Sequence, residues 1–198
     1  TFSPERGAKR ATWLITAAGL AEKGSWEFEV VDASGRQFFA TRGQGRPPKR
    51  IEWTGRDAQG ASAPDGTYRC RATGQDREGN RVQSDEVRIS LDRTAPEMRV
   101  KLPAPWTDFA KTPRVRIGLE SSERNTLAEW RLAMTDDRGR EIRNFAGRGN
   151  APAEIAWDGT NGKGVLLSPG AFVSLKLTGV DIAGNMGFSE ETGLQLEM

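Results

Sequence analysis

Hydrophobic and polar residues alternate along several short stretches of this chain, which is the pattern of β-strands with one buried and one solvent-exposed face. The clearest stretches run from Trp26 to Val30 and from Trp130 to Met134, and shorter ones surround Trp53 and Trp157. No stretch carries a sustained apolar stripe at the 3.6-residue period of an amphipathic helix. The pattern therefore predicts an all-β protein with little helix.

The two halves of the chain repeat the same landmarks. A separation of 104 residues relates the pairs Trp26 and Trp130, Gly35 and Gly139, Trp53 and Trp157, and Gly66 and Gly170. A separation of 105 residues relates the later pairs Asp76 and Asp181, Gly79 and Gly184, Asn80 and Asn185, and Leu91 and Leu196. One residue is therefore inserted in the second half, between Gly170 and Asp181.

This period indicates a duplication of whole domains, because a β-sandwich of the immunoglobulin type needs about 100 residues, whereas solenoid repeats are much shorter. We expect two tandem immunoglobulin/fibronectin-III-like β-sandwiches, residues 1–93 and residues 94–198. A single larger β domain is the alternative for a chain of 198 residues. The segment Asp92–Pro96 ends in a proline, which fixes φ and removes a donor, so it suits a stiff hinge between the two sandwiches.

The inserted residue affects the long strand that follows it. The first half alternates regularly through Tyr68, Cys70 and Ala72. The second half shows a series in which the alternation slips by one position, namely Phe172, Val173, Leu175 and Leu177. Such a slip turns every later side chain to the other face of the sheet unless a β-bulge absorbs it. We predict a bulge between Phe172 and Leu177.

The composition excludes several kinds of chemistry. The chain has no histidine, the commonest general base and metal ligand, and no serine lies in a Gly-x-Ser-x-Gly motif. Its single cysteine, Cys70, excludes an internal disulfide and a cysteine-built zinc site, and is interpreted as a small buried hydrophobic residue. The loop Asp158–Gly164 lacks the ligand spacing of a calcium loop. We expect no enzymatic activity, no catalytic residue, no cofactor and no metal.

The charge balance is nearly flat. Lys and Arg number 29 and Asp and Glu number 27, which gives a formal net charge of +2. Such a balance does not predict binding to nucleic acid or to anionic membranes. No run approaches the roughly 18 apolar residues that a transmembrane helix requires, and no secretion signal opens the chain. No membrane span is therefore expected in this chain.

Three short motifs in each half carry a family resemblance. They are Ile51–Gly55, Pro64–Tyr68 and Asp76–Asn80 in the first half, and Ile155–Gly159, Ser168–Phe172 and Asp181–Asn185 in the second. The chain resembles the immunoglobulin-like domain of the flagellar hook-capping protein and its relatives in modular bacterial cell-envelope proteins. The resemblance implies export to the periplasm or cell surface, and a role as spacer, scaffold or adhesive module without catalysis.

The candidate binding residues are aromatic and basic. Trp106 has no partner in the first half, and together with Phe109 it either packs between the domains or forms an exposed binding patch. The densest basic cluster, from Arg42 to Arg50, is either a solvated loop or a binding site for an anionic polymer. Its candidate residues are Arg42, Arg46, Lys49 and Arg50. The repeated tryptophans are interpreted as core residues, with an aromatic platform for sugar as the alternative.

Together these observations predict a non-enzymatic structural, spacer or protein-binding segment of an exported modular bacterial envelope protein. Its expected partners are other envelope proteins or other domains of the same parent protein. The alternative is a module that binds carbohydrate or peptidoglycan, with cell-wall polysaccharide as the partner. Unpaired strand edges of the sandwiches could also accept a partner strand, although no residue of the sequence shows which edge.

Overall fold

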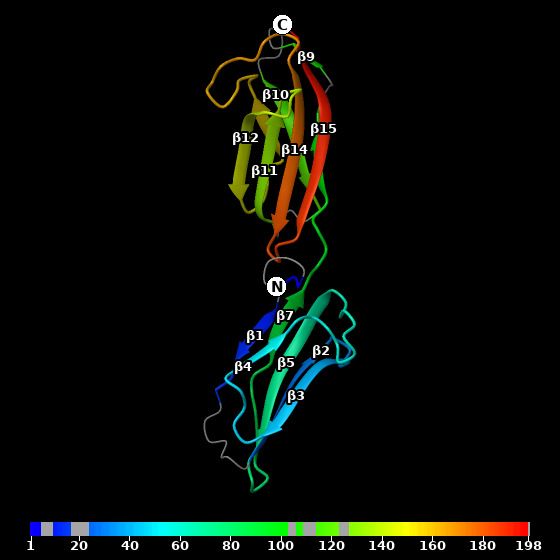
Figure 1. The fold of residues 1–198 in the computed structure, drawn as a ribbon, viewed down its shortest axis with the longest axis vertical. Coiled ribbons are helices and arrows are strands. Elements are labelled where there is room, and N and C mark those ends of the chain that lie inside the picture. The colour runs from blue at the N-terminus through cyan, green and yellow to red at the C-terminus, as the bar shows by residue number, and fades with distance from the viewer. Residues whose placement is uncertain (5–9, 17–23, 103–105, 109–113, 123–126, 198) are drawn as a thin grey trace. The chain divides into compact units, whose positions relative to one another are not determined.

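The computed structural model describes residues 1–4, 10–16, 24–102, 106–108, 114–122 and 127–197 (Figure 1). The chain divides into two compact units, Thr1–Thr94 and Ala95–Met198, called module 1 and module 2 below. Within the described ranges every regular element is a β-strand and none is a helix. The chain is all-β, with two tandem immunoglobulin/fibronectin-III-like β-sandwiches.

Module 1 consists of two antiparallel sheets. Its strands are β1 (Ala11–Leu14), β2 (Ser25–Val31), β3 (Gln37–Gln44), β4 (Arg50–Trp53), β5 (Gly66–Gln75), β6 (Arg81–Gln83) and β7 (Val87–Leu91). The larger sheet has the order β3-β2-β5-β6, and β7 pairs with the other end of β5. The smaller sheet pairs β1 with β4. Beside these sheets, Phe2 forms a parallel bridge to Leu91.

The core of module 1 lies where the two sheets face each other. Trp53 is 1% exposed, its indole N–H donates to the carbonyl of Arg56 at 2.7 Å, and its ring meets those of Phe2 and Tyr68 edge-on. Cys70 is buried in the same core, as the alternation of β5 predicted. The buried residues of this core are Phe2, Phe28, Val30, Phe38, Ile51, Trp53, Ala63, Tyr68, Cys70 and Leu91.

Module 2 has the same organisation with additional pairing. Its strands are β8 (Met98–Lys101), β9 (Trp106–Asp108), β10 (Val115–Ser121), β11 (Leu127–Thr135), β12 (Glu141–Arg148), β13 (Glu154–Trp157), β14 (Phe172–Asp181) and β15 (Met186–Glu197). One sheet has the order β12-β11-β14-β15-β9 and the other the order β13-β10-β8. Among the described strands of module 2, β9 alone pairs in parallel, with the end of β15.

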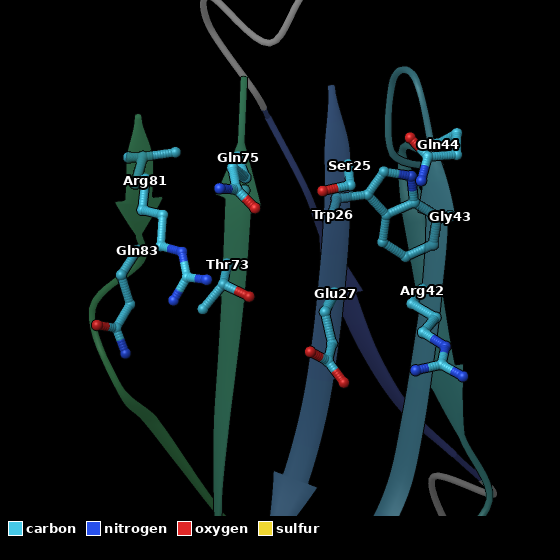
Figure 2. Close-up of a pocket in the computed structure, with 12 residues that line it drawn as sticks. Ser25, Trp26, Glu27, Arg42, Gly43, Gln44, Thr73, Gln75, Arg81 and Gln83 are labelled. Carbon is cyan, nitrogen blue, oxygen red and sulfur yellow. The ribbon is translucent and has the colours of Figure 1, made fainter. Parts of the chain in front are cut away.

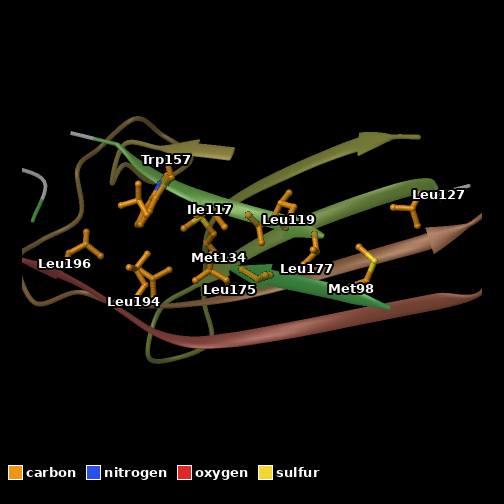
Figure 3. Packing of buried hydrophobic residues seen from close by; sticks show 14 residues of the cluster. Met98, Ile117, Leu119, Leu127, Met134, Trp157, Leu175, Leu177, Leu194 and Leu196 are labelled. Atoms are coloured by element: carbon orange, nitrogen blue, oxygen red, sulfur yellow. The ribbon is translucent and has the colours of Figure 1, made fainter. Parts of the chain in front are cut away.

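Buried side chains from both sheets of module 2 interdigitate (Figure 3). Trp157 is fully buried, and its indole N–H donates to the carbonyl of Thr160 at 2.8 Å, as Trp53 does to Arg56. The core interpretation of these two tryptophans is therefore confirmed. Trp26 and Trp130 are only partly buried and pack at the border of each core.

The insertion in module 2 lies before the strand, so part of the bulge prediction needs correction. Leu175 pairs with Met134 as Cys70 pairs with Val30, so Val173 occupies the place of Tyr68. From Val173 onward β14 alternates without a slip, and the extra residue falls in the preceding turn, which leaves Phe172 44% exposed.

A register shift does occur within the predicted range, between Val173 and Ser174 in the pairing with β15. Its extra residue is Gly193 of β15, not a residue of β14. Gly193 has a φ of 107°, a conformation that glycine adopts without strain, so the bulge is accommodated on the neighbouring strand.

Candidate functional site

A polar groove crosses one end of the larger sheet of module 1 (Figure 2). Its volume is about 690 Å³. Four neighbouring strands contribute the side chains that line it, among them Glu27 of β2, Arg42 of β3, Gln75 of β5 and Arg81 of β6. We call this feature the Trp26 groove, because Trp26 of β2 is among the residues that line it.

Strand register explains why these polar residues meet. Glu27 pairs with Arg42 on one side and with Thr73 on the other, and Thr73 pairs with Gln83. Because alternate residues of a strand share a face, residues two positions along each strand form a second parallel row. That second row consists of Gln44, Ser25, Gln75 and Arg81.

Glycines flank Trp26 on both neighbouring strands. Trp26 pairs with Gly43 of β3 and with Gly74 of β5. A Cβ added to Gly43 would stand 2.9 Å from Cζ2 of Trp26, so the indole rests on the backbone of β3. The indole Nε1 is buried and has no hydrogen-bond partner among the described residues. Trp26 shares one face of β2 with the core residue Phe28, so this buried donor lies on the opposite face of the sheet from the polar side chains of the groove.

The charged groups of the groove are available to a ligand. Within the described part of the chain, neither Arg42 nor Arg81 forms an ion pair, and both side chains are exposed. Gln83 is engaged, because with its side-chain amide turned so that the oxygen faces Arg71, this oxygen accepts from Nη1 and Nε of Arg71 at 2.7 and 2.8 Å. The two guanidinium groups can therefore donate charge-assisted hydrogen bonds to hydroxyl or carboxylate groups, and the Glu27 carboxylate can accept them from hydroxyl groups.

Module 2 has a groove of about 620 Å³ at the same place, with different chemistry. Trp130 lies between Gly147 and Gly179, as Trp26 lies between Gly43 and Gly74. The polar residues of the first groove are replaced by apolar ones at three counterpart positions, which are Ala146, Val180 and Met186 in place of Arg42, Gln75 and Arg81. The duplication therefore repeats the scaffold without repeating the surface chemistry.

The sequence-predicted basic residues do not come together. Arg42 alone lines the Trp26 groove. Arg50 belongs to the smaller sheet, where it forms an ion pair with Glu52 at 2.5 Å. Arg46 and Lys49 are exposed in the intervening segment, and the carbonyl of Lys49 accepts from the N–H of Ile15 at 3.0 Å.

Of the two aromatic candidates, the structure describes the position of one. Trp106 lies in β9, whose backbone pairs with β15, and Phe109 lies outside the described residues. Thr107 pairs with Leu196 as Phe2 bridges to Leu91, so the segment of Trp106 does have a counterpart in module 1. The comparison of the two halves of the sequence missed this counterpart, because the two segments share no residue that marks their distance from the next strand.

The glycines of the groove were also missed, although a signal was present. Gly43 and Gly147 are 104 residues apart, and Gly74 and Gly179 are 105 apart, which are the two separations of the repeat. A glycine inside a strand pattern marks a close approach to its backbone. Pairing each glycine with the repeated tryptophan would have predicted the stacked arrangement.

The loop Asp158–Gly164 uses its oxygens for turn formation. The carboxylate of Asp158 accepts from the N–H and the hydroxyl of Thr160, at 3.1 and 2.6 Å, and the hydroxyl bond lowers the pKa of that carboxyl. The side-chain oxygen of Asn161 accepts from the N–H groups of Lys163 and Val165. Among the described residues, no group of three or more Cys, Asp or Glu side chains is arranged to hold a metal ion. The described residues also include no helix with the length and apolarity to cross a membrane.

No protein-family model matches the chain, and no curated protein matches it. Solved structures of tandem β-modules do. A tetra-tandem repeat in the extending region of a large adhesion protein is 18% identical with a TM-score of 0.40, over 92% of this chain and 48% of that one. The fibronectin(III)-like modules of Clostridium thermocellum CbhA are 13% identical with a TM-score of 0.41, over 100% and 87%.

A third similar structure is that of a 1.5-MDa bacterial ice-binding adhesin, 13% identical with a TM-score of 0.44 over 96% of this chain and 57% of that one. This chain thus spans about half the length of the two adhesin chains that it matches. The likeness is one of fold, and it assigns no function to the Trp26 groove.

Proposed function

We propose that the chain is a non-enzymatic structural segment, a spacer or protein-binding module, of an exported modular bacterial envelope protein. The duplication of a whole β-sandwich, each copy with its own buried core, carries the proposal. The motifs similar to the immunoglobulin-like domain of the flagellar hook-capping protein support a place in the periplasm or at the cell surface. The partners on this proposal are other envelope proteins or other domains of the same parent protein.

Hydrogen bonds and an ion pair attach the last residues of module 1 to the β-sandwich of that module. The Arg93 guanidinium donates to the carbonyls of Ala63 at 2.7 Å and Gly55 at 3.0 Å, and it pairs with Asp65 at 2.9 Å. Asp65 also accepts from the backbone N–H of Arg93 and the hydroxyl of Thr94. These bonds fix the chain as far as Thr94.

The start of module 2 is held in the same way. Pro96 is buried, and its carbonyl oxygen lies so close to Gly187 that a Cβ there would overlap it. Glu97 exchanges two hydrogen bonds with Ser122, at 2.9 and 3.0 Å. Ala95 is therefore the single residue between two anchored stretches. A connection this short supports a spacer whose length is set by the modules.

The test changes the length of that connection in the parent protein. A ten-residue Gly/Ser insertion after Ala95 is compared with the same insertion between Gly162 and Lys163, an exposed turn of module 2. The spacer proposal predicts that only the insertion after Ala95 impairs assembly of the complex containing the parent protein. Equal assembly of both insertion variants and the unaltered protein would overturn it.

The Trp26 groove supports a second candidate function, the binding of carbohydrate or peptidoglycan. Its exposed polar groups suit hydroxyl and carboxylate groups. The test is co-sedimentation with isolated peptidoglycan of the Arg42→Ala/Arg81→Ala variant against Arg46→Ala/Arg50→Ala. Both variants lose two positive charges, so a loss of retention confined to the first would support the groove. Equal retention of both would remove this candidate.

A further inference from the structure

The turn at Asn161 and Gly162 contains a chemically labile pair of residues. Asn161 is the only asparagine of the chain that a glycine follows. The backbone nitrogen of the residue after an asparagine can attack the side-chain amide carbon, and glycine has no side chain to hinder that attack. Whether the reaction proceeds depends on how the turn holds the Gly162 nitrogen and the Asn161 amide.

The reaction is a deamidation that consumes only water. The Gly162 nitrogen loses its proton and forms a bond to Cγ of Asn161, while the bond from Cγ to the amide nitrogen breaks. The leaving NH2 group takes up the equivalent of that proton and departs as ammonia, which leaves a cyclic succinimide. Water then opens the ring at either of its carbonyls. The product is aspartate or isoaspartate, whose main chain runs through Cβ and Cγ.

Hydrogen bonds hold both reacting groups in the folded turn. The Gly162 N–H donates to the carbonyl of Ile142 in β12 at 2.8 Å. The side-chain oxygen of Asn161 accepts from the N–H groups of Lys163 and Val165, at 2.9 and 3.1 Å. The first bond retains the proton that the nitrogen must lose, and the other two fix the orientation of the amide. The folded turn therefore opposes ring closure.

The main chain at Asn161 is fixed as well. Its N–H donates to the carbonyl of Val165 at 2.8 Å, and its carbonyl accepts from the N–H of Gly164 at 3.0 Å. The guanidinium of Arg143 donates to the same carbonyl and to the hydroxyl of Thr160, each at 2.9 Å. Arg143 belongs to β12, the end strand of its sheet (Figure 1). This side chain therefore attaches the turn to the edge of the sheet.

Burial does not account for the protection of this turn. Gly162 and Lys163 are exposed, and Asn161 is only partly buried. Water and hydroxide therefore reach the turn, and its hydrogen bonds are what separates the folded state from the reaction. Exposed segments of this kind open by local unfolding, without unfolding of the whole domain. The rate of deamidation should then follow the population of the opened turn.

Module 1 shows that aspartate fits the same turn. Asp57 stands 104 positions before Asn161, and its carboxylate accepts from the N–H groups of Gln59 and Ala61 at 3.0 and 2.8 Å. The aspartate product should therefore keep the turn. Isoaspartate lengthens the main chain by a methylene group, so the backbone bonds on the two sides of Asn161 cannot all be retained.

We propose that Asn161 is a deamidation site that the contact between its turn and β12 keeps unreactive. Arg143 is the side chain that secures this contact. When the turn opens, the Gly162 nitrogen is released from Ile142 and closes the ring. The site is independent of the proposed spacer and protein-binding function.

The test follows the conversion of Asn161 in the full chain by peptide mapping and mass spectrometry, during incubation in mildly alkaline buffer. Arg143→Met removes the guanidinium and keeps a long side chain. Arg140→Met is the matched control, because it removes the same charge from a residue that pairs with Asp136 and not with the turn. The Asn161→Asp variant serves as the standard for the product. Thermal melting establishes that both arginine variants fold, and the unaltered chain in urea gives the rate without the fold.

We expect the folded unaltered chain and Arg140→Met to convert at least about tenfold more slowly than the chain in urea, which corresponds to about 1.4 kcal/mol. Arg143→Met should convert about tenfold faster than Arg140→Met, because the turn loses hydrogen bonds from a charged donor. Equal rates in the folded chain and in urea, or equal rates in the two arginine variants, would overturn the proposal.

Discussion

In module 1 the indole of Trp26 rests on the backbone of Gly43, its partner in the neighbouring strand. The indole lies so close to this backbone that a side chain at position 43 would not fit between them. Trp130 and Gly147 repeat the relationship in module 2, where a Cβ on the glycine would stand 2.8 Å from the indole Nε1. The repetition in both copies indicates that the glycine serves tryptophan packing.

Gly43→Ala should therefore destabilise module 1. The added methyl group forces the indole or the strand to shift, and overpacking of this kind lowers the free energy of unfolding by about 1–3 kcal/mol. Gly147→Ala should have a similar effect on module 2. Urea denaturation measures both. Gly162→Ala is the control, because its Cβ would be 3.7 Å from the nearest atom, and an equal loss of stability in all three variants would refute the packing argument.

Tyr68→Phe should weaken module 1 and leave module 2 unchanged. The hydroxyl of Tyr68 donates to the carbonyl of Pro64 at 2.5 Å, and its loss lowers the free energy of unfolding by about 1 kcal/mol. Val173 occupies the corresponding place in module 2, where no hydroxyl is present. Denaturation followed with a separate probe for each module checks the prediction, and an unchanged midpoint for module 1 would contradict it.

The stability of module 1 should fall below about pH 4 through Asp65. Burial alone would raise the pKa of Asp65, but hydrogen bonds from the Arg93 N–H, the Thr94 hydroxyl and the Arg93 guanidinium hold it below its ordinary value of 3.8. A carboxyl with a depressed pKa stabilises the folded state above its unfolded pKa, and this contribution is lost as the pH falls through the folded pKa.

Asp65→Asn should accordingly lower the stability of module 1 at pH 7 and flatten its dependence on pH between about 2 and 5. Thermal melting across this range measures the effect. The control is Asp137→Asn, which changes an exposed residue of the β11–β12 turn. Parallel pH profiles for Asp65→Asn and the unaltered chain would contradict the assigned role.

The Cys70 thiol should resist labelling until module 1 unfolds. It is 1% exposed, and burial, with a smaller contribution from Glu86, raises its pKa to about 12. The reactive thiolate is therefore absent in the folded state at pH 8. Reaction with a thiol-specific reagent should follow the urea transition of module 1. Rapid labelling without denaturant would show that the thiol is accessible.

Sequence reasoning predicted the strand pattern because alternation depends on residues close together in the chain, and it predicted the repeat because the same landmark residues recur at separations of 104 and 105. Trp53 and Trp157 are buried as the alternation required. The placement of Phe172 was wrong, because motif spacing assigns it to the place of Tyr68 whereas strand pairing assigns Val173.

The grooves could not be derived in the same way. The Trp26 groove depends on the register of four strands, and β6 reaches it from a separate hairpin.

The most direct test of the central claim is a cross-linking pull-down of the purified chain with an envelope extract and, separately, with isolated peptidoglycan, read by mass spectrometry. A structural, protein-binding segment predicts one dominant cross-linked protein and no retention on peptidoglycan. Retention on peptidoglycan with no protein partner would contradict the claim and assign the chain to the cell-wall-binding alternative.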